Sequence, residues 1–180
     1  MKNILFIAAL LCSFATKAQV TKVAIQASGL TCSMCSNAIN KSLRSIDFVQ
    51  NVDANIKTST FEITFKPGTA VDFDKLKKKV EDAGFFVANF TATIHFDKVQ
   101  LVNDGLVTID GTTFHFLNIK DQVLDGNKSI QLIDKGYVTA KAYKANGKYT
   151  SMECYKTGVA EACCIKDGLK MGARVFQATI

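Results

Sequence analysis

Residues 29–36 read Gly-Leu-Thr-Cys-Ser-Met-Cys-Ser and place two cysteines, Cys32 and Cys35, three positions apart. An alternating apolar pattern precedes this stretch and a helical pattern follows it, which predicts Cys32 in a loop and Cys35 in the first turn of a helix. Two thiols at this spacing can hold a soft metal ion or cycle between dithiol and disulfide. The function of the chain depends on which of these the pair does.

The patterns around the two cysteines, over residues 20–90, predict an α+β domain. Asp72 is suited to cap a second helix and Gly84 to end it. The resulting order is βαββαβ, the ferredoxin-like arrangement in which two helices cover one face of an antiparallel sheet. The strand patterns behind this prediction cover 23–27, 48–54, 61–65 and 85–90, and the helical patterns cover 35–46 and 73–83.

Residues 29–35 resemble the Gly-Met-Thr-Cys-x-x-Cys signature of heavy-metal-associated domains, which occur in copper chaperones, in the N-terminal modules of copper-pumping ATPases and in periplasmic mercury-binding proteins. The resemblance extends over about 20–90 and includes the segment 81–85, which ends the second helix in the family. Leu30 replaces the usual methionine and is expected to pack into the hydrophobic core beneath the loop. Phe85 matches an aromatic position near the metal loop.

This resemblance implies Cu(I) as the first metal to consider, with Cys32 and Cys35 as its ligands. Soft thiolates suit Cu(I), and two of them leave it open to exchange with a third thiol. The N-terminus of a helix also stabilises a negative charge on Cys35. Hg(II) and Ag(I) suit the same thiolates, whereas Zn(II), the remaining alternative, prefers four ligands in a closed site.

Two other interpretations of the cysteine pair stay open. A thioredoxin-like centre also places Cys-x-x-Cys at a helix start, which would make the protein a thiol-disulfide oxidoreductase. The absence of tryptophan, and the position of the single proline, Pro67, at a strand end, count against that enzyme. A receptor-like protein, whose first half senses metal and whose second half binds a partner, is a further alternative.

The N-terminal residues 1–18 have the pattern of a cleavable signal peptide. Lys2 gives a basic start, an apolar run covers 4–11, and a small-residue cleavage site ends at Ala18. The expected location is therefore periplasmic or secreted. No stretch has the length of a membrane-spanning helix, so stable membrane insertion is not expected. The formal net charge of +6 is modest and identifies no class of partner.

An odd number of cysteines remains once Cys12 leaves with the signal peptide, so disulfides alone cannot use them all. Besides the first pair, these are Cys154, Cys163 and Cys164. One interpretation is a disulfide between Cys154 and one of the other two, which staples a loop. The other is a second thiolate cluster that takes metal from the first pair or shares it.

Residues 91–180 predict a small β-rich domain, for which an OB-type barrel and a plain β-sandwich both fit. Asp110-Gly111 between two apolar runs is a strong hairpin signal, and Thr139 is suited to cap a short helix. The two histidines, His95 and His115, lie on strand patterns and are expected to be surface or satisfied strand residues rather than metal ligands.

No phosphate-binding loop, nucleophile triad or paired-carboxylate pattern is present in the sequence, and its basic residues are scattered without stacking aromatics. Nucleic-acid binding and catalysis are therefore not expected. The predicted function is metal binding for transfer, buffering or detoxification. The resemblance implies a metal donor or acceptor protein as partner, such as a metal-transporting ATPase, and an exposed Cys-x-x-Cys could also bridge two copies through one Cu(I).

Overall fold

The computed structural model describes residues 20–30 and 33–180, so the predicted signal peptide and Cys32 lie outside the described residues. The first half contains β1 (Val20–Ser28), α1 (Ser33–Arg44), β2 (Val49–Asn55), β3 (Thr60–Phe65), α2 (Phe73–Asp82) and β4 (Phe86–Leu101). The second half contains β5 (Gly105–Ile109), β6 (Thr112–Phe116), β7 (Gln122–Leu132), α3 (Ala140–Asn146), the 3-10 turn η2 (Gly147–Tyr149), α4 (Cys154–Thr157), α5 (Ala162–Ile165) and β8 (Val175–Thr179).

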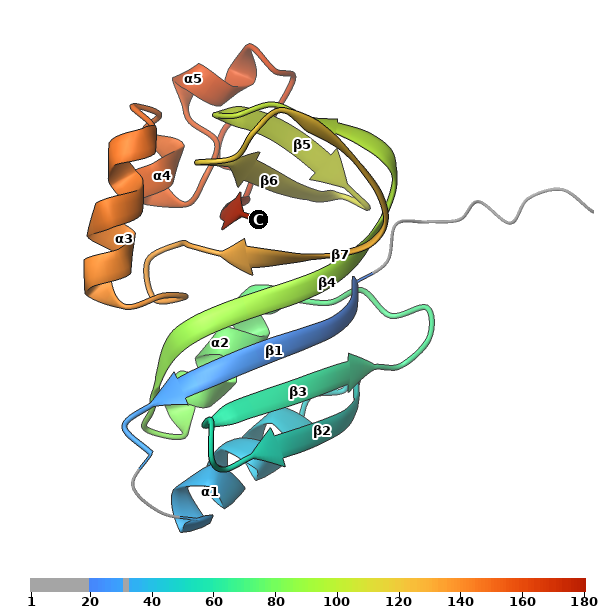
Figure 1. Cartoon of the computed structure of the whole chain (residues 1–180), viewed down its shortest axis with the longest axis vertical. Coiled ribbons are helices and arrows are strands. Elements are labelled where there is room, and N and C mark those ends of the chain that lie inside the picture. Colours follow the sequence, from blue (N-terminus) through green and yellow to red (C-terminus); the bar gives the residue numbers. More distant parts are fainter. Residues whose placement is uncertain (1–19, 31–32) are drawn as a thin grey trace, which may run out of the picture.

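The first half has the predicted order βαββαβ. Val23 and Ile25 of β1 alternate with more exposed neighbours and are fully buried, as a half-covered strand requires. Helices α1 and α2 pack against each other, α1 over β2 and α2 over β4 (Figure 1). The Asp72 side chain accepts the Lys75 backbone N–H at 2.9 Å and caps α2. Gly84 follows that helix with φ +89°, a left-handed value that favours glycine.

Strand β4 joins the two halves of the chain. It pairs antiparallel with β1 through Phe86 to Ile94 and with β7 through Phe90 to Leu101. The boundary predicted at residue 90 therefore falls inside one strand, and the eight strands of the described residues form one mixed sheet, in the order β2-β3-β1-β4-β7-β8-β6-β5 (Figure 1). The α+β class is confirmed, whereas a separate OB-type barrel over 91–180 is not.

The second half contains the hairpin and the helix that its sequence indicates. Asp110 and Gly111 both have positive φ, 47° and 78°, as the turn between β5 and β6 requires. Thr139 accepts the Ala142 backbone N–H and caps α3. Strand β8 pairs in parallel with β6 and antiparallel with β7, which the sequence did not predict. Of the helices in the described part of the chain, none combines the length and apolarity needed to cross a membrane.

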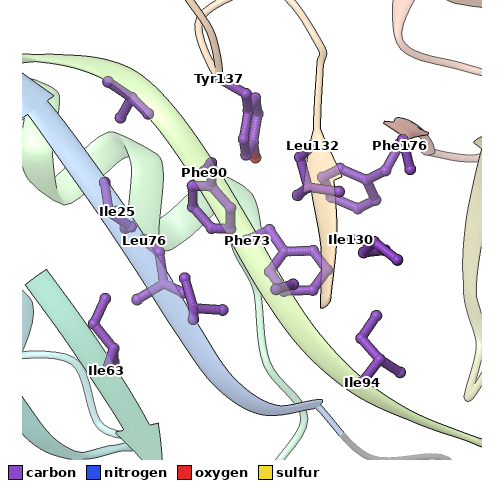
Figure 2. Packing of buried hydrophobic residues seen from close by; sticks show 14 of the residues in the cluster. Ile25, Ile63, Phe73, Leu76, Phe90, Ile94, Ile130, Leu132, Tyr137 and Phe176 are labelled. Carbon is purple, nitrogen blue, oxygen red and sulfur yellow. The ribbon is translucent and has the colours of Figure 1, made fainter. Parts of the chain in front are cut away.

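One hydrophobic core extends under both halves of the sheet. Phe73 of α2 is 1% exposed, and its ring packs edge-on against Phe90 of β4 and Phe176 of β8, with centroids 5.7 and 5.3 Å away (Figure 2). Phe114 of β6 lies 6.2 Å from the same ring. A helix of the first half thus buries its first residue against strands of the second half.

An ion cluster at the boundary between the halves adds a polar connection. Arg174, just before β8, pairs with Asp134 at 2.8 Å and with Asp74 of α2 at 2.9 Å. Tyr137 also donates its hydroxyl to Asp74 at 2.7 Å. Burial alone would raise the pKa of Asp74, but its bonds from Arg174 and Tyr137 outweigh burial and lower that pKa.

Asp134 makes stability depend on pH. Burial raises its pKa from 3.8 to about 6, against the opposing effect of Arg174. The native state therefore holds a proton between about pH 4 and pH 6 that the unfolded chain releases, and the free energy of unfolding should fall by about 3 kcal/mol as pH rises through this window. The Asp74 carboxylate has a lowered pKa, so its contribution makes the free energy of unfolding rise with pH, and it does so below pH 4.

Urea unfolding at several pH values between 4 and 7 measures this slope. Asp134→Asn removes the titrating group and should flatten the profile between pH 4 and pH 6 relative to the unchanged protein. Equal slopes for the two proteins would show that Asp134 does not carry the pH dependence.

Candidate metal centre

Cys35 lies in the first turn of α1, where the sequence predicted it, and is half-buried. No acidic side chain occupies that turn, which is the positive end of the helix dipole. Met34, in the same turn, is 81% exposed. Cys32 lies outside the described residues, so the geometry of the pair stays a prediction.

The start of the cysteine loop is packed onto the first half of the chain. Gly29 has φ +85°, and a Cβ atom added to it would contact the Phe85 ring at 4.0 Å. Leu30 packs against the main hydrophobic core. Both observations agree with the roles predicted for Phe85, an aromatic beside the loop, and for Leu30, a plug beneath it.

Exposed apolar side chains surround this end of the molecule. Met34 and Ile56, 81% and 59% exposed, line one shallow hollow beside the start of α1. Phe86, 73% exposed, begins β4 opposite Ser28, the last residue before the loop. Large exposed apolar residues gathered near a functional group are typical of contact surfaces.

The three late cysteines meet at one point in the second half. Cys154 begins α4, and Cys163 and Cys164 lie in α5. Their Sγ atoms all lie within 4.8 Å of one another, and those of Cys163 and Cys164 are 3.6 Å apart. Cys154 and Cys164 are fully buried, whereas Cys163 is partly exposed. No disulfide joins any two of these three residues.

The surroundings make the three thiols chemically unequal. Burial and the neighbouring Cys164 thiol raise the pKa of Cys154, and burial also raises that of Cys164. Burial opposes ionisation of Cys163 too, but the Cys164 thiol and the backbone amides of Cys154 and Glu153 outweigh it and lower the pKa of Cys163. Cys163 is therefore the member of the cluster that ionises most readily.

His115 lies against this cluster. It is fully buried, and its Nδ1 lies 3.8 Å from Cys154 Sγ and 2.7 Å from Gln177 Oε1, while its Nε2 lies 2.8 Å from Asp104 Oδ1. The prediction of a satisfied strand histidine agrees with these bonds. Its place beside Cys154 was missed because it depends on the parallel pairing of β6 with β8, for which the sequence has no local signal.

Cys35 and the three late cysteines lie at opposite ends of the molecule. Helix α1, which begins beside the cysteine loop, occupies one end of the long axis, and α4 and α5 occupy the other (Figure 1). The sheet order agrees, since α1 covers β2 while the late cysteines pack near Val175 of β8. One ion shared between the two groups does not fit this arrangement.

Comparisons with known proteins concern the first half. Residues 24–86 match the heavy-metal-associated domain. The chain is 30% identical over 82 residues to a probable copper-exporting P-type ATPase of Archaeoglobus fulgidus, covering 46% of this chain and 10% of the ATPase. It is 34% identical over 73 residues to a copper-exporting P-type ATPase of Staphylococcus saprophyticus, covering 41% of this chain and 9% of that protein. The chain thus spans about a tenth of the length of these curated relatives.

Among solved structures, the chain is similar to a yeast copper transporter domain determined in its apo and Cu(I)-loaded states. The two are 34% identical, and the match covers 36% of this chain and 88% of that domain, with a TM-score of 0.33.

Proposed function

Since residues 24–86 place this chain in the heavy-metal-associated domain family, we propose that it is a carrier that binds Cu(I) through Cys32 and Cys35 and releases it by thiol exchange. The carrier would serve transfer, buffering or detoxification and would catalyse no reaction. The position of Cys35 carries the proposal. A partly exposed thiol in the first turn of a helix can be reached by an incoming thiol.

The surface around Cys35 supports exchange with another protein. Met34 neighbours Cys35 in the first turn of α1 and shares an exposed hollow with Ile56, so a donor or acceptor protein could contact these apolar side chains while the ion moves. We propose a metal-transporting ATPase as that partner, because the curated relatives are copper ATPases. The signal pattern in residues 1–18 further supports a periplasmic or secreted location.

Competition between the reduced protein and a chromophoric Cu(I) chelator tests this proposal. The double change Cys32→Ser and Cys35→Ser should lower the Cu(I) affinity at this site by more than about 100-fold. Loss of a residue that only hydrogen-bonds a metal ligand already lowers metal affinity by about 10–100-fold, and this change removes the ligands themselves. Met34→Leu is the matched control. It changes a sulfur-bearing side chain in the same stretch and should leave affinity unchanged.

A double variant that still takes up as many equivalents of Cu(I) as the unchanged protein would contradict the proposal. The alternative, a thiol-disulfide oxidoreductase using the same pair, makes a different prediction. Its metal-free form would cycle its disulfide with a protein substrate, whereas a carrier is protected from oxidation by bound Cu(I). Size-exclusion chromatography with and without Cu(I) distinguishes a monomeric carrier from a dimer bridged by the ion.

A further inference from the structure

We propose that the second half of the chain holds its own metal site, in which Cys154, Cys163 and Cys164 bind one soft d10 cation, such as Cu(I), through three sulfur ligands. This site is separate from Cys35, because α1, which carries Cys35, lies at the opposite end of the molecule from α4 and α5 (Figure 1). Three converging thiols on a hydrogen-bonded loop, with no fourth His, Cys, Asp or Glu ligand grouped with them among the described residues, carry the inference.

The sulfur positions fit a three-coordinate ion. Metal–thiolate bonds are about 2.3 Å long, so three sulfurs spread evenly around one cation lie about 4 Å apart. The three Sγ atoms lie within 4.8 Å of one another, and those of Cys163 and Cys164 are 3.6 Å apart. Binding therefore needs only small side-chain adjustments.

Backbone hydrogen bonds hold the ligand-bearing loop against β8. Gly158 has φ +73°, and its N–H donates to the Cys154 carbonyl at 2.9 Å. The Val175 N–H donates to the Gly158 carbonyl at 3.0 Å, and the Ala160 N–H donates to the Ala173 carbonyl at 2.7 Å. Because the loop is fixed before an ion arrives, binding loses little conformational entropy.

His115 is close to the site but is not available as a ligand. Gln177 Nε2 donates to the carbonyls of Cys154 and Val175, so Gln177 Oε1 accepts from His115 Nδ1, and the Asp104 carboxylate faces His115 Nε2. With both ring nitrogens engaged by Gln177 and Asp104, His115 supplies no fourth ligand, which disfavours Zn(II) and favours Cu(I).

Packing or a disulfide accounts for the cluster less well. Adjacent residues have Cα atoms about 3.8 Å apart, below the range of about 4.4–6.8 Å for unstrained disulfides, so Cys163 and Cys164 are poorly placed to bond each other. A disulfide from Cys154 to either of them would leave the third thiol beside it. A purely apolar role suits buried cysteines, but Cys163 is partly exposed and gives an ion a route in from solvent.

The test uses the full chain with the first site removed by Cys32→Ser and Cys35→Ser, kept reduced by a phosphine. We expect this protein to bind one equivalent of Cu(I) against the chelator, with three sulfur neighbours in its X-ray absorption spectrum. Adding Cys163→Ser, the change least disruptive to packing, should lower the Cu(I) affinity by at least about 10-fold. Even the loss of a residue that only hydrogen-bonds a metal ligand lowers metal affinity by about 10–100-fold.

Met152→Leu is the matched control for sulfur near the cluster, since Met152 packs against it and leucine has a similar volume. It should leave affinity and sulfur count unchanged. Circular dichroism of each metal-free variant verifies folding. A folded first-site variant that binds no Cu(I), or equal affinity with and without Cys163→Ser, would overturn this inference. Either result leaves the proposed function of the first site intact, because that site is tested by its own double variant.

Discussion

Replacing Arg174 by methionine is expected to lower the free energy of unfolding by about 3 kcal/mol, the lower end of the range for breaking a buried ion pair. Arg174 lies 2.8 Å from Asp134 and 2.9 Å from Asp74, and it also donates to the Gly158 and Val175 carbonyls. Without the guanidinium, Asp134, which is 5% exposed, has to keep a charge with no cationic partner or take up a proton. The greater exposure of Asp74 limits the loss, since water screens that carboxylate.

Urea unfolding at pH 7 measures the effect of this change, and two further variants control it. Lys78→Met removes an exposed pair with Asp82 and should leave the free energy of unfolding nearly unchanged. Combining Arg174→Met with Asp134→Asn should recover part of the stability, because the buried Asp134 carboxyl without a cationic partner is then absent. A loss below about 1 kcal/mol for Arg174→Met would mean that the ion cluster contributes no more than a surface pair.

Replacing Phe73 by alanine is expected to cost about 3–5 kcal/mol, because it removes a fully buried ring and leaves a cavity. The ring contacts Phe90, Phe114 and Phe176, so the cavity would open between the two halves of the chain (Figure 2). Thermal unfolding followed by calorimetry should show one transition in the unchanged protein, shifted as a whole in Phe73→Ala.

Phe86→Ala is the matched control, since it deletes the same side chain at a position that is 73% exposed. Its effect should stay within about 0.5 kcal/mol. Two separate transitions, with Phe73→Ala lowering the midpoint temperature of only one, would show instead that residues 20–90 and 91–180 are independent domains. The change of sequence pattern near residue 90 suggested such a division.

The first half could be predicted from sequence because its signals are local. The alternation in β1, the cap at Asp72 and the left-handed Gly84 each act within a few residues, and the structure confirms all three. The same holds for the Asp110-Gly111 turn in the second half. Such signals specify an element without information about the rest of the chain.

The arrangement of the second half could not be predicted in this way, because it depends on contacts between distant residues. β4 continues past residue 90 since β7 pairs with it, and β8 lies beside β6 although more than fifty residues separate them. The late cysteines were recognised as a group in the sequence. Their meeting beside His115 depends on these pairings, as does the distance of that group from Cys35.

The shared strand β4 also determines where another chain can add to the sheet. In an isolated βαββαβ sheet the fourth strand is an edge, with unpaired N–H and C=O groups that invite strand addition and aggregation. Here β7 covers that side of β4, so in the described part of the chain only β2 and β5 remain as edges. A partner in the proposed metal transfer therefore cannot add a strand at β4, and a fragment ending at residue 90 would expose β4 as an unpaired edge.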